Sequence, residues 1–156
     1  AIDASEKNIN IASIHAKKNK LKIKYLNAAP ENINKDNNFD IILNLEIVEH
    51  VEDLNLYLNS CAKLLKKNGI MFTATINRNL ISYLKAIVGA EYILRWLPIG
   101  THDWNKFLKP EELEKMINDV GISTVDVKGL SYNPFLNRWK KSNDLSVNYI
   151  ITAKKN

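Results

Sequence analysis

The sequence of 156 residues predicts an α/β fold with an open, mostly parallel sheet that ends in an antiparallel strand pair. Short apolar or β-branched runs alternate with segments of helical spacing, which is the pattern of such sheets. The run Phe39–Leu45 is mostly apolar and therefore suits a strand that is covered on both faces. The last two strand-like runs, Ile122–Leu130 and Val147–Ala153, are joined by the loop SYNPFLNRWKKSND, which favours antiparallel pairing.

The first elements follow from local patterns. Ile2 and Asp3 read as the end of a strand, and Ser5 can cap a helix that runs to about Lys18. The residues Leu21–Leu26 alternate between apolar and charged side chains, which predicts a short strand. Residues 34–38 are rich in Asn and Asp and predict a turn before the strand Phe39–Leu45.

The central elements are equally regular. Val51–Leu65 has apolar residues at helical spacing, and Asn68-Gly69 predicts the end of that helix. The β-branched and aromatic run Ile70–Ile76 predicts the next strand. After a long apolar segment, a further helix is predicted to begin at Pro110, with acidic residues in its first turn, and to end at Gly121.

Composition limits the classes of function. Hydrophobic residues make up 46% and charged residues 25%, which fits one globular domain. The single cysteine, Cys61, allows neither a disulfide framework nor a cysteine zinc site, and it fits the reducing cytoplasm. The segment Lys7–Lys24 carries +6 and Glu31–Asp53 carries −6. Because the lysines lie on a helix-like stretch without interleaved aromatic residues, we read them as a solvated face and expect no nucleic-acid partner.

Polar side chains follow two of the predicted strands, where open α/β sheets bind their ligands. Asp3 at the end of the first strand suits a carboxylate that accepts hydrogen bonds from ribose hydroxyls, although it equally suits the opening of a turn. After Leu45, the residues Glu46, Glu49 and His50 have the spacing of one helical face. This trio suits a divalent cation or a general base for a phenol, and the alternative is that it only caps a helix.

The segment Leu80–Leu97 is mainly apolar and helical but is interrupted by Lys85, Glu91 and Arg95, so it does not resemble a membrane span. Three interpretations are open: a helix that lies on the membrane surface, a lid over an apolar substrate, and an ordinary buried helix pair.

These segments resemble a known family. The stretch FDIILNLEIVEHVEDLNLYLNSCAKLLKKNGIMFTATINRN resembles the central motifs of class I S-adenosylmethionine-dependent methyltransferases, which have a Rossmann-like sheet. The stretches NRNLISYLKAIVGAEYILRWLPIGTHDWNKFLKPEEL and GLSYNPFLNRW are more specific and resemble the ubiquinone-biosynthesis O-methyltransferases. The resemblance covers nearly the whole chain.

The resemblance implies methyl transfer from S-adenosylmethionine to phenolic hydroxyls of a polyprenyl-hydroxyphenol and of demethylubiquinol. It implies that Asp3 holds the cofactor's ribose, that Leu45 lines the adenosine site, and that Glu46, Glu49 and His50 are catalytic and bind Mg²⁺. It also implies one methyltransferase domain over residues 1–156, with a helical lid or membrane-facing insertion at about 78–108. We therefore expect an enzyme of the cytoplasm that meets the inner face of the membrane through Leu80–Leu97.

One departure from the family concerns the cofactor loop. The family begins with a helical segment, a strand and a glycine-rich loop, whereas none of the five glycines here precedes Gly69. The domain is therefore expected to be the C-terminal part of a longer one, lacking the first strand and the glycine-rich loop. If the domain is not part of a longer one, we expect closure of the sheet, or pairing with a second copy in a homo-oligomer, to fill the place of the missing first strand. On either expectation, the chain alone binds cofactor weakly.

Two other functions compete with this reading. The chain could be a catalytically silent α/β scaffold in a quinone- or lipid-synthesis complex. Nucleic-acid methylation is disfavoured, because the nearest approach to a base-flipping motif, Asn133-Pro134-Phe135, falls in the last predicted hairpin.

Overall fold

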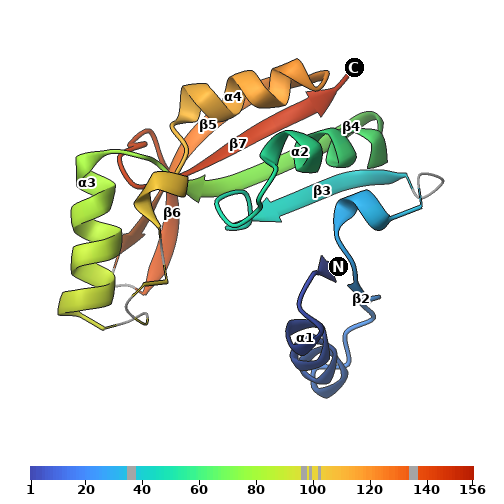
Figure 1. The fold of residues 1–156 in the computed structure, drawn as a ribbon, viewed down its shortest axis with the longest axis horizontal. Coiled ribbons are helices and arrows are strands. Elements are labelled where there is room, and N and C mark those ends of the chain that lie inside the picture. The colour runs from blue at the N-terminus through green and yellow to red at the C-terminus, as the bar shows by residue number, and fades with distance from the viewer. Residues whose placement is uncertain (35–37, 96–97, 99, 102, 134–136) are drawn as a thin grey trace.

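The computed structural model describes the chain except for residues 35–37, 96–97, 99, 102 and 134–136. It has the predicted α/β fold, with a five-stranded sheet, a small two-stranded sheet near the N-terminus, and helices around both (Figure 1). The motif Asn133-Pro134-Phe135 and part of the turn predicted at residues 34–38 lie outside the described residues.

The N-terminal unit consists of β1 (Ile2–Asp3), α1 (Glu6–Lys18) and β2 (Leu26–Asn27), followed by the 3-10 turn η1 (Pro30–Asn32). The Ser5 side chain accepts a hydrogen bond from the backbone N–H of Asn8, which confirms the predicted N-cap. The strand predicted at Leu21–Leu26 is wrong in extent. β2 pairs only with β1 along two residues, so a longer strand would leave its backbone groups unpaired.

The main sheet has the strand order β3-β4-β7-β5-β6. β3 and β4 are parallel, and the other three pairings are antiparallel, so the sheet is mixed and more antiparallel than expected. The antiparallel pairing of the last two predicted strands is confirmed. The strands are β3 (Phe39–Leu45), β4 (Leu65–Ile76), β5 (Ile122–Asn133), β6 (Arg138–Ser142) and β7 (Asn148–Lys155).

Two helices, α2 (Leu54–Leu64) and α4 (Pro110–Asp119), cover one face of this sheet (Figure 1). α2 begins later than predicted because Asp53 caps its first turn, and β4 begins at Leu65, directly where the helix ends. Lys155 on β7 donates to the carbonyls of Ala62 and Leu65 and so stabilises that end. The core between helices and sheet contains Val48, Tyr57, Leu58, Cys61, Ala62, Leu65, Met71, Leu113, Ile117, Ile122, Tyr149, Ile151 and Ala153.

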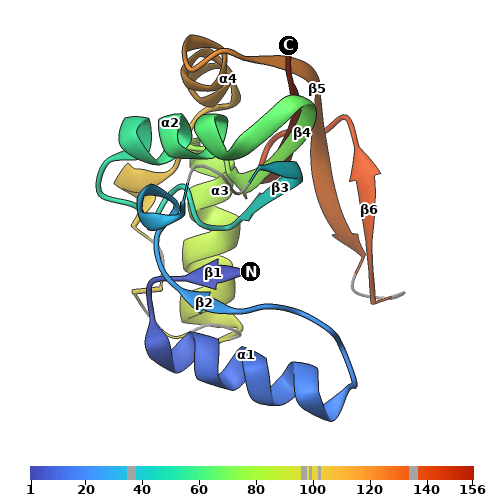
Figure 2. The ribbon, with the colours of Figure 1, turned by 90° about the vertical axis from the view of Figure 1, so that its right-hand side faces the viewer.

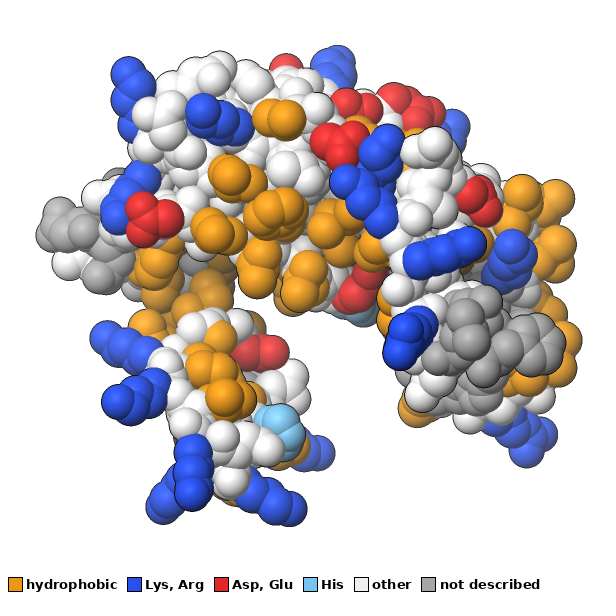
Figure 3. Space-filling view, turned by 180° about the vertical axis from the view of Figure 1, so that it is seen from behind, with side chains coloured by type: hydrophobic (Ala, Val, Ile, Leu, Met, Phe, Trp, Pro, Cys, Tyr) orange, Lys and Arg blue, Asp and Glu red, His pale blue; other side chains and the backbone are white. Residues whose placement is uncertain are grey.

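The opposite face of β3 is not covered by the described part of the chain. Ile41, Leu43 and Leu45 are 56%, 61% and 57% exposed, whereas Asn44 on the other face is buried. Figure 3 shows a row of hydrophobic side chains along the underside of the sheet, above a hollow between two projecting parts of the molecule. The prediction that Phe39–Leu45 is covered on both faces is therefore wrong for these residues, and β3 also lies at the edge of the sheet.

The segment after β4 leaves the sheet as the helix α3 (Leu80–Ser82), which continues as the π-helix η2 (Tyr83–Ile93). Asn79 and Ser82 form a capping box at its start. The 3-10 turn η3 (Trp104–Lys106) returns the chain, and the Trp104 indole donates to the Asn79 carbonyl. The predicted helix is thus confirmed as far as Ile93, while residues 96–97 lie outside the described part.

Among the described residues, no helix has both the length and the apolar character needed to cross a bilayer.

Candidate active site

A cavity of about 870 Å³ lies where β3 and β4 end and where the chain turns away from the sheet. Its walls come from the ends of these strands, from the turn after β3, from η2, from the hairpin of β5 and β6, and from the start of β7. In an α/β sheet this is the edge at which ligands bind. Its lining residues include Leu45, Glu46, Glu49, His50, Lys85, Thr101, Leu130, Tyr132, Trp139, Asp144 and Asn148.

Glu49 is the most deeply placed ionisable residue of this cavity, with an exposed fraction of 3%. One carboxylate oxygen, Oε2, accepts a 2.8 Å hydrogen bond from the hydroxyl of Thr75 on β4. The other oxygen, Oε1, is buried and has no hydrogen-bond donor among the described residues. A buried carboxylate oxygen without a donor is costly, so Oε1 is a site at which a proton or a ligand group would be favoured.

Glu46 lies beside Glu49 in the same cavity and has its backbone in the left-handed region, at φ 51°. As a residue it is exposed at the cavity mouth, but the surrounding protein removes enough water from its carboxyl group to raise the pKa. This desolvation is the main cause, and the negative charge and hydrogen bonding of Glu49 add to it, so the pKa rises to about 7. A protonated Glu46 can donate a hydrogen bond to the neighbouring Glu49 carboxylate.

The predicted trio is therefore brought to one cavity, but not on one helical turn. Residues 46–50 form a bend and a turn, and α2 begins only at Leu54. His50 lines the cavity and is exposed, with its backbone N–H bonded to the carbonyl of Ile47. The cavity thus places two adjacent carboxyl groups and an imidazole along one wall, a set that can remove a proton from a hydroxyl group.

The role of Glu46, Glu49 and His50 as metal ligands stays a prediction. In the described ranges, no three His, Cys, Asp or Glu side chains lie close enough together to hold a metal ion. The two carboxyl groups interact with each other, while His50 does not complete a coordination set with them. The side chains as placed therefore do not fit a three-ligand Mg²⁺ site.

Asp3 and Leu45, the two predicted cofactor residues, line different cavities. Leu45 lines the large cavity, whereas Asp3 lines a smaller one of about 480 Å³ beside α1. The Asp3 carboxylate accepts hydrogen bonds from the backbone N–H of Ser5 and from the Asn8 side chain. Asp3 therefore performs the turn-opening role that the sequence left open as an alternative, and its contact with a ribose stays a prediction.

The sequence did not predict the far wall of the large cavity. Tyr132 and Trp139 stand on β5 and β6, but the segment that contains β6 was read as a loop. The aromatic residues of GLSYNPFLNRW were a signal that this segment has a buried or ligand-facing side. Asn137 at a positive φ of 47° marks the turn into β6.

The chain is similar to known methyltransferases in sequence and in fold. A family model described as a methyltransferase domain matches residues 1–73. Ubiquinone biosynthesis O-methyltransferases are similar over almost the whole chain. The protein from Pelagibacter ubique is 57% identical over 99% of this chain and 65% of its own length. Those from Bartonella tribocorum and Rhodopseudomonas palustris are 49% and 48% identical, over 63% and 60% of their lengths.

The chain thus spans 60–65% of the length of these curated relatives. Solved structures of methyltransferases show the same fold at low sequence identity. A protein from Thermotoga maritima described as a possible histamine N-methyltransferase has a TM-score of 0.67 at 18% identity, over 99% of this chain and 72% of that one. Magnesium protoporphyrin IX methyltransferase from Synechocystis, with bound S-adenosylhomocysteine, has a TM-score of 0.69 at 15% identity, over 99% and 63%.

Proposed function

Because this chain is a homologue of the ubiquinone biosynthesis O-methyltransferases and has the class I S-adenosylmethionine-dependent methyltransferase fold, we propose that it transfers a methyl group to a phenolic oxygen. The acceptors are the hydroxyl groups of a polyprenyl-hydroxyphenol and of demethylubiquinol. The observation that carries the proposal is the pair Glu46 and Glu49, which lies in a large cavity at the carboxyl end of β3.

The chemistry of such a site is simple. S-adenosylmethionine supplies a methyl group on a sulfonium, which an oxygen nucleophile displaces in line. A neutral phenol is a poor nucleophile, so the protein must take its proton as the new bond forms. Glu46, with a pKa of about 7, is partly ionised at neutral pH and suits that role. Positioning of the two reactants supplies much of the remaining acceleration.

The residues present fit part of a cofactor site. Leu45 offers an apolar contact at the large cavity, and Asp3 offers a carboxylate at the end of β1. A glycine-rich phosphate- or methionine-binding loop is not among them, since no glycine precedes Gly69. We therefore expect the chain by itself to bind S-adenosylhomocysteine more weakly than micromolar. Isothermal titration measures this directly, and micromolar binding would contradict the expectation.

The helix α3–η2 supports a second part of the proposal, that the protein works at a membrane surface. Its exposed side chains are largely apolar and aromatic, including Leu80 at 70% and Ile93 at 71% exposed. Lys85 lies among them, and the exposed Arg95 follows two residues after the helix ends. Apolar and aromatic residues flanked by cations are typical of interfacial helices. Such a surface would bring the cavity close to a polyprenylated acceptor in the bilayer.

The test of the function is methyl transfer from radiolabelled S-adenosylmethionine to a polyprenylated catechol. The assay uses the longest native protein that contains residues 1–156. The Glu46→Gln variant should lose at least about a hundredfold in kcat, the usual contribution of a general base. Glu52→Gln is the matched control, because Glu52 is exposed nearby and does not line the cavity. Equal activity of all three proteins would contradict the role given to Glu46.

The alternative function, a catalytically silent scaffold, makes a different prediction. A scaffold that binds through α3–η2 should float with anionic liposomes but transfer no methyl group, whatever the acceptor. A Leu84→Glu change on the exposed helix should abolish flotation under both readings, since Leu84 is 53% exposed. Flotation without methyl transfer by the wild-type protein would favour the scaffold.

A further inference from the structure

The hairpin of β5 and β6 extends beyond the rest of the sheet. β5 pairs with β7 as far as Leu130, which lies opposite Asn148, and from Ser131 to Asn133 its sheet neighbour is β6. In Figures 1 and 2 the hairpin and the helix α3–η2 project from the same end of the sheet. The large cavity is lined from both, by Lys85 of η2 and by Leu130, Tyr132 and Trp139 of the hairpin.

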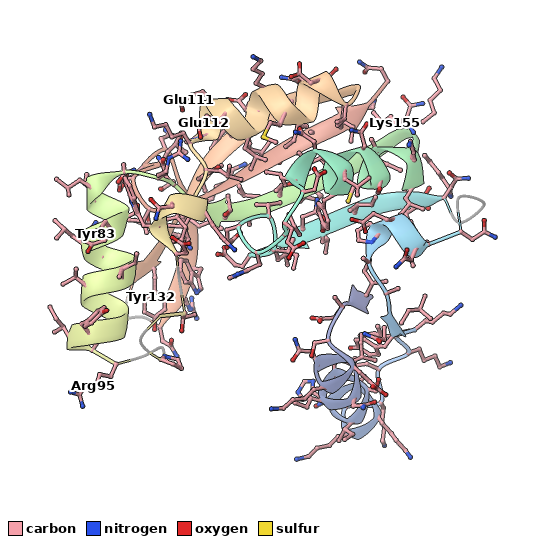
Figure 4. The ribbon with its side chains drawn as sticks, in the orientation of Figure 1. Tyr83, Arg95, Glu111, Glu112, Tyr132 and Lys155 are labelled. Carbon is pink, nitrogen blue, oxygen red and sulfur yellow. The ribbon has the colours of Figure 1, made fainter. Side chains whose placement is uncertain are left out.

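The two aromatic residues stand opposite each other on this hairpin. Tyr132 and Trp139 are cross-strand partners, with ring centroids 5.3 Å apart and planes inclined at 46°. The Tyr132 hydroxyl donates a 2.6 Å hydrogen bond to the Asn137 side chain, which fixes the ring on the hairpin. Figure 4 labels Tyr132 toward the free end of the hairpin.

Neither ring is part of the core. Trp139 is 60% exposed and Tyr132 is 39% exposed, although both line the cavity. Large aromatic side chains bury about 150–250 Å² when they are covered, so an exposed pair inside a cavity is an energetically favourable surface for an apolar ligand.

The cavity wall therefore has an ionisable part and an aromatic part. Glu46, Glu49 and His50 stand at the end of β3, and Leu130, Tyr132 and Trp139 stand on the hairpin. Ile76 and Val147 lie in the lining as well and add apolar surface. Consider a phenol whose hydroxyl group lies beside Glu46 and Glu49. A substituent on its ring would then lie against the hairpin or against η2.

We propose that Tyr132 and Trp139 form an aromatic wall that binds the hydrocarbon chain next to the reacting ring. This wall makes the site select phenols that carry such a chain over phenols that lack it. The inference rests on the proposed function only for the orientation of the ring. The wall is a specificity element, since neither side chain is given a part in proton removal or methyl transfer.

The test compares two acceptors on the whole chain: catechol, and catechol with a hexyl chain at carbon 3. Isothermal titration of the wild type should show at least about tenfold tighter binding of hexylcatechol, because each buried CH₂ contributes about 0.8 kcal/mol at most. In the Trp139→Ala variant, the ratio of the catechol Kd to the hexylcatechol Kd should fall to about threefold or less. The catechol Kd itself should stay within about twofold of the wild-type value. Trp139→Phe should retain most of the ratio, because it keeps an aromatic face.

Val125→Ala is the matched control. Val125 is 65% exposed on the same strand, β5, but does not line the cavity, so its loss should leave the ratio unchanged. Circular dichroism of every variant checks that the fold is intact.

The inference is overturned if the wild type binds both catechols equally. A Trp139→Ala variant that weakens both ligands by the same factor, or neither, overturns it as well. Failure of the proposed function shows separately, as absence of methyl transfer to either acceptor by the longest native protein that contains these residues.

Discussion

At the scale of single residues, Glu49 shows how a buried carboxylate is kept in place. Its Oε2 has the Thr75 hydroxyl as a donor, and its Oε1 has no donor among the described residues. Two carboxyl groups this close ionise together only with difficulty, so the pair holds one proton more readily than none. Glu46 must release this proton before it can accept one from a phenolic substrate.

The raised pKa of Glu46 predicts a dependence of stability on pH. The folded protein keeps the proton up to about pH 7, whereas an ordinary glutamate loses it near 4.5. Glu46 therefore contributes stability below pH 4.5, and that contribution is lost as the pH rises towards 7. Denaturant unfolding at pH 5 and 7.5 should show wild type losing stability relative to Glu46→Gln over this interval.

Glu49→Gln is the companion variant for that measurement. It removes the neighbouring negative charge, so the pKa of Glu46 should fall and the pH dependence should shrink. Parallel stability curves for wild type and Glu46→Gln between pH 5 and 7.5 would contradict the raised pKa.

The sequence placed the right polar residues at the site but could not predict their ionisation. Glu46, Glu49 and His50 follow a strand, and strand ends meet at one edge of a sheet, so their gathering could be foreseen. The pKa of Glu46 depends on how much water reaches it and on the orientation of Glu49, which Thr75 holds from a different strand. Local spacing contains no information about that contact.

At the scale of elements, the loop after β6 is held against β5 at Gly129. A Cβ at this position would overlap the backbone carbonyl oxygen of Asp144. The Ser142 hydroxyl accepts a hydrogen bond from the Asp144 backbone N–H and so helps to hold this crossing. This close approach sets where Asp144 and Ser146 enter the cavity wall.

Gly129→Ala should therefore displace that loop. We expect a loss of about 2 kcal/mol or more in the free energy of unfolding, because backbone atoms must move to relieve the overlap. Val125→Ala, an exposed change on the same strand, should stay within about 0.5 kcal/mol. Urea denaturation of both variants measures the difference, and equal stability would show that the crossing adjusts freely.

Elements with strong local signals were predicted well, and those that depend on distant partners were not. α1 and α4 have caps and a stop in the sequence, such as Ser5, Pro110 and Gly121, and they form at the expected places. β6 exists because β5 extends past β7 and offers it a partner. Its sequence, Arg138–Ser142, has one apolar side chain, Trp139, among polar ones and is exposed except at its end, so it lacks the alternation that predicts a strand.

At the scale of the whole molecule, the face of β3 that carries Ile41, Leu43 and Leu45 and the outer edge of β3 are both open to solvent in the described structure (Figure 3). Exposed apolar faces of this kind mark surfaces that associate, and open strand edges can pair with other strands. A homo-oligomer that uses this surface stays a prediction from the sequence.

Leu43→Lys is the test of that surface in this chain. Leu43 is 61% exposed on the uncovered face, so a charge there should reduce self-association with little loss of folded-state stability. Light scattering against protein concentration should show a smaller mean mass for the variant. Phe72→Lys is a poor alternative because that residue is less exposed. An unchanged mass distribution would mean that the open face takes no part in association.

The position of β7 has a consequence for synthesis. β7 lies between β4 and β5, although it follows both in the sequence. From the end of β4 at Ile76 to the end of β7 at Lys155 the ribosome must add 79 residues, which takes roughly 4–16 seconds at ordinary elongation rates. During that interval β4 has β3 as its sheet partner and must wait for the strand on its other side. A nascent chain arrested within β6 should therefore be digested readily by protease along β4, and it should become resistant only once β7 has emerged.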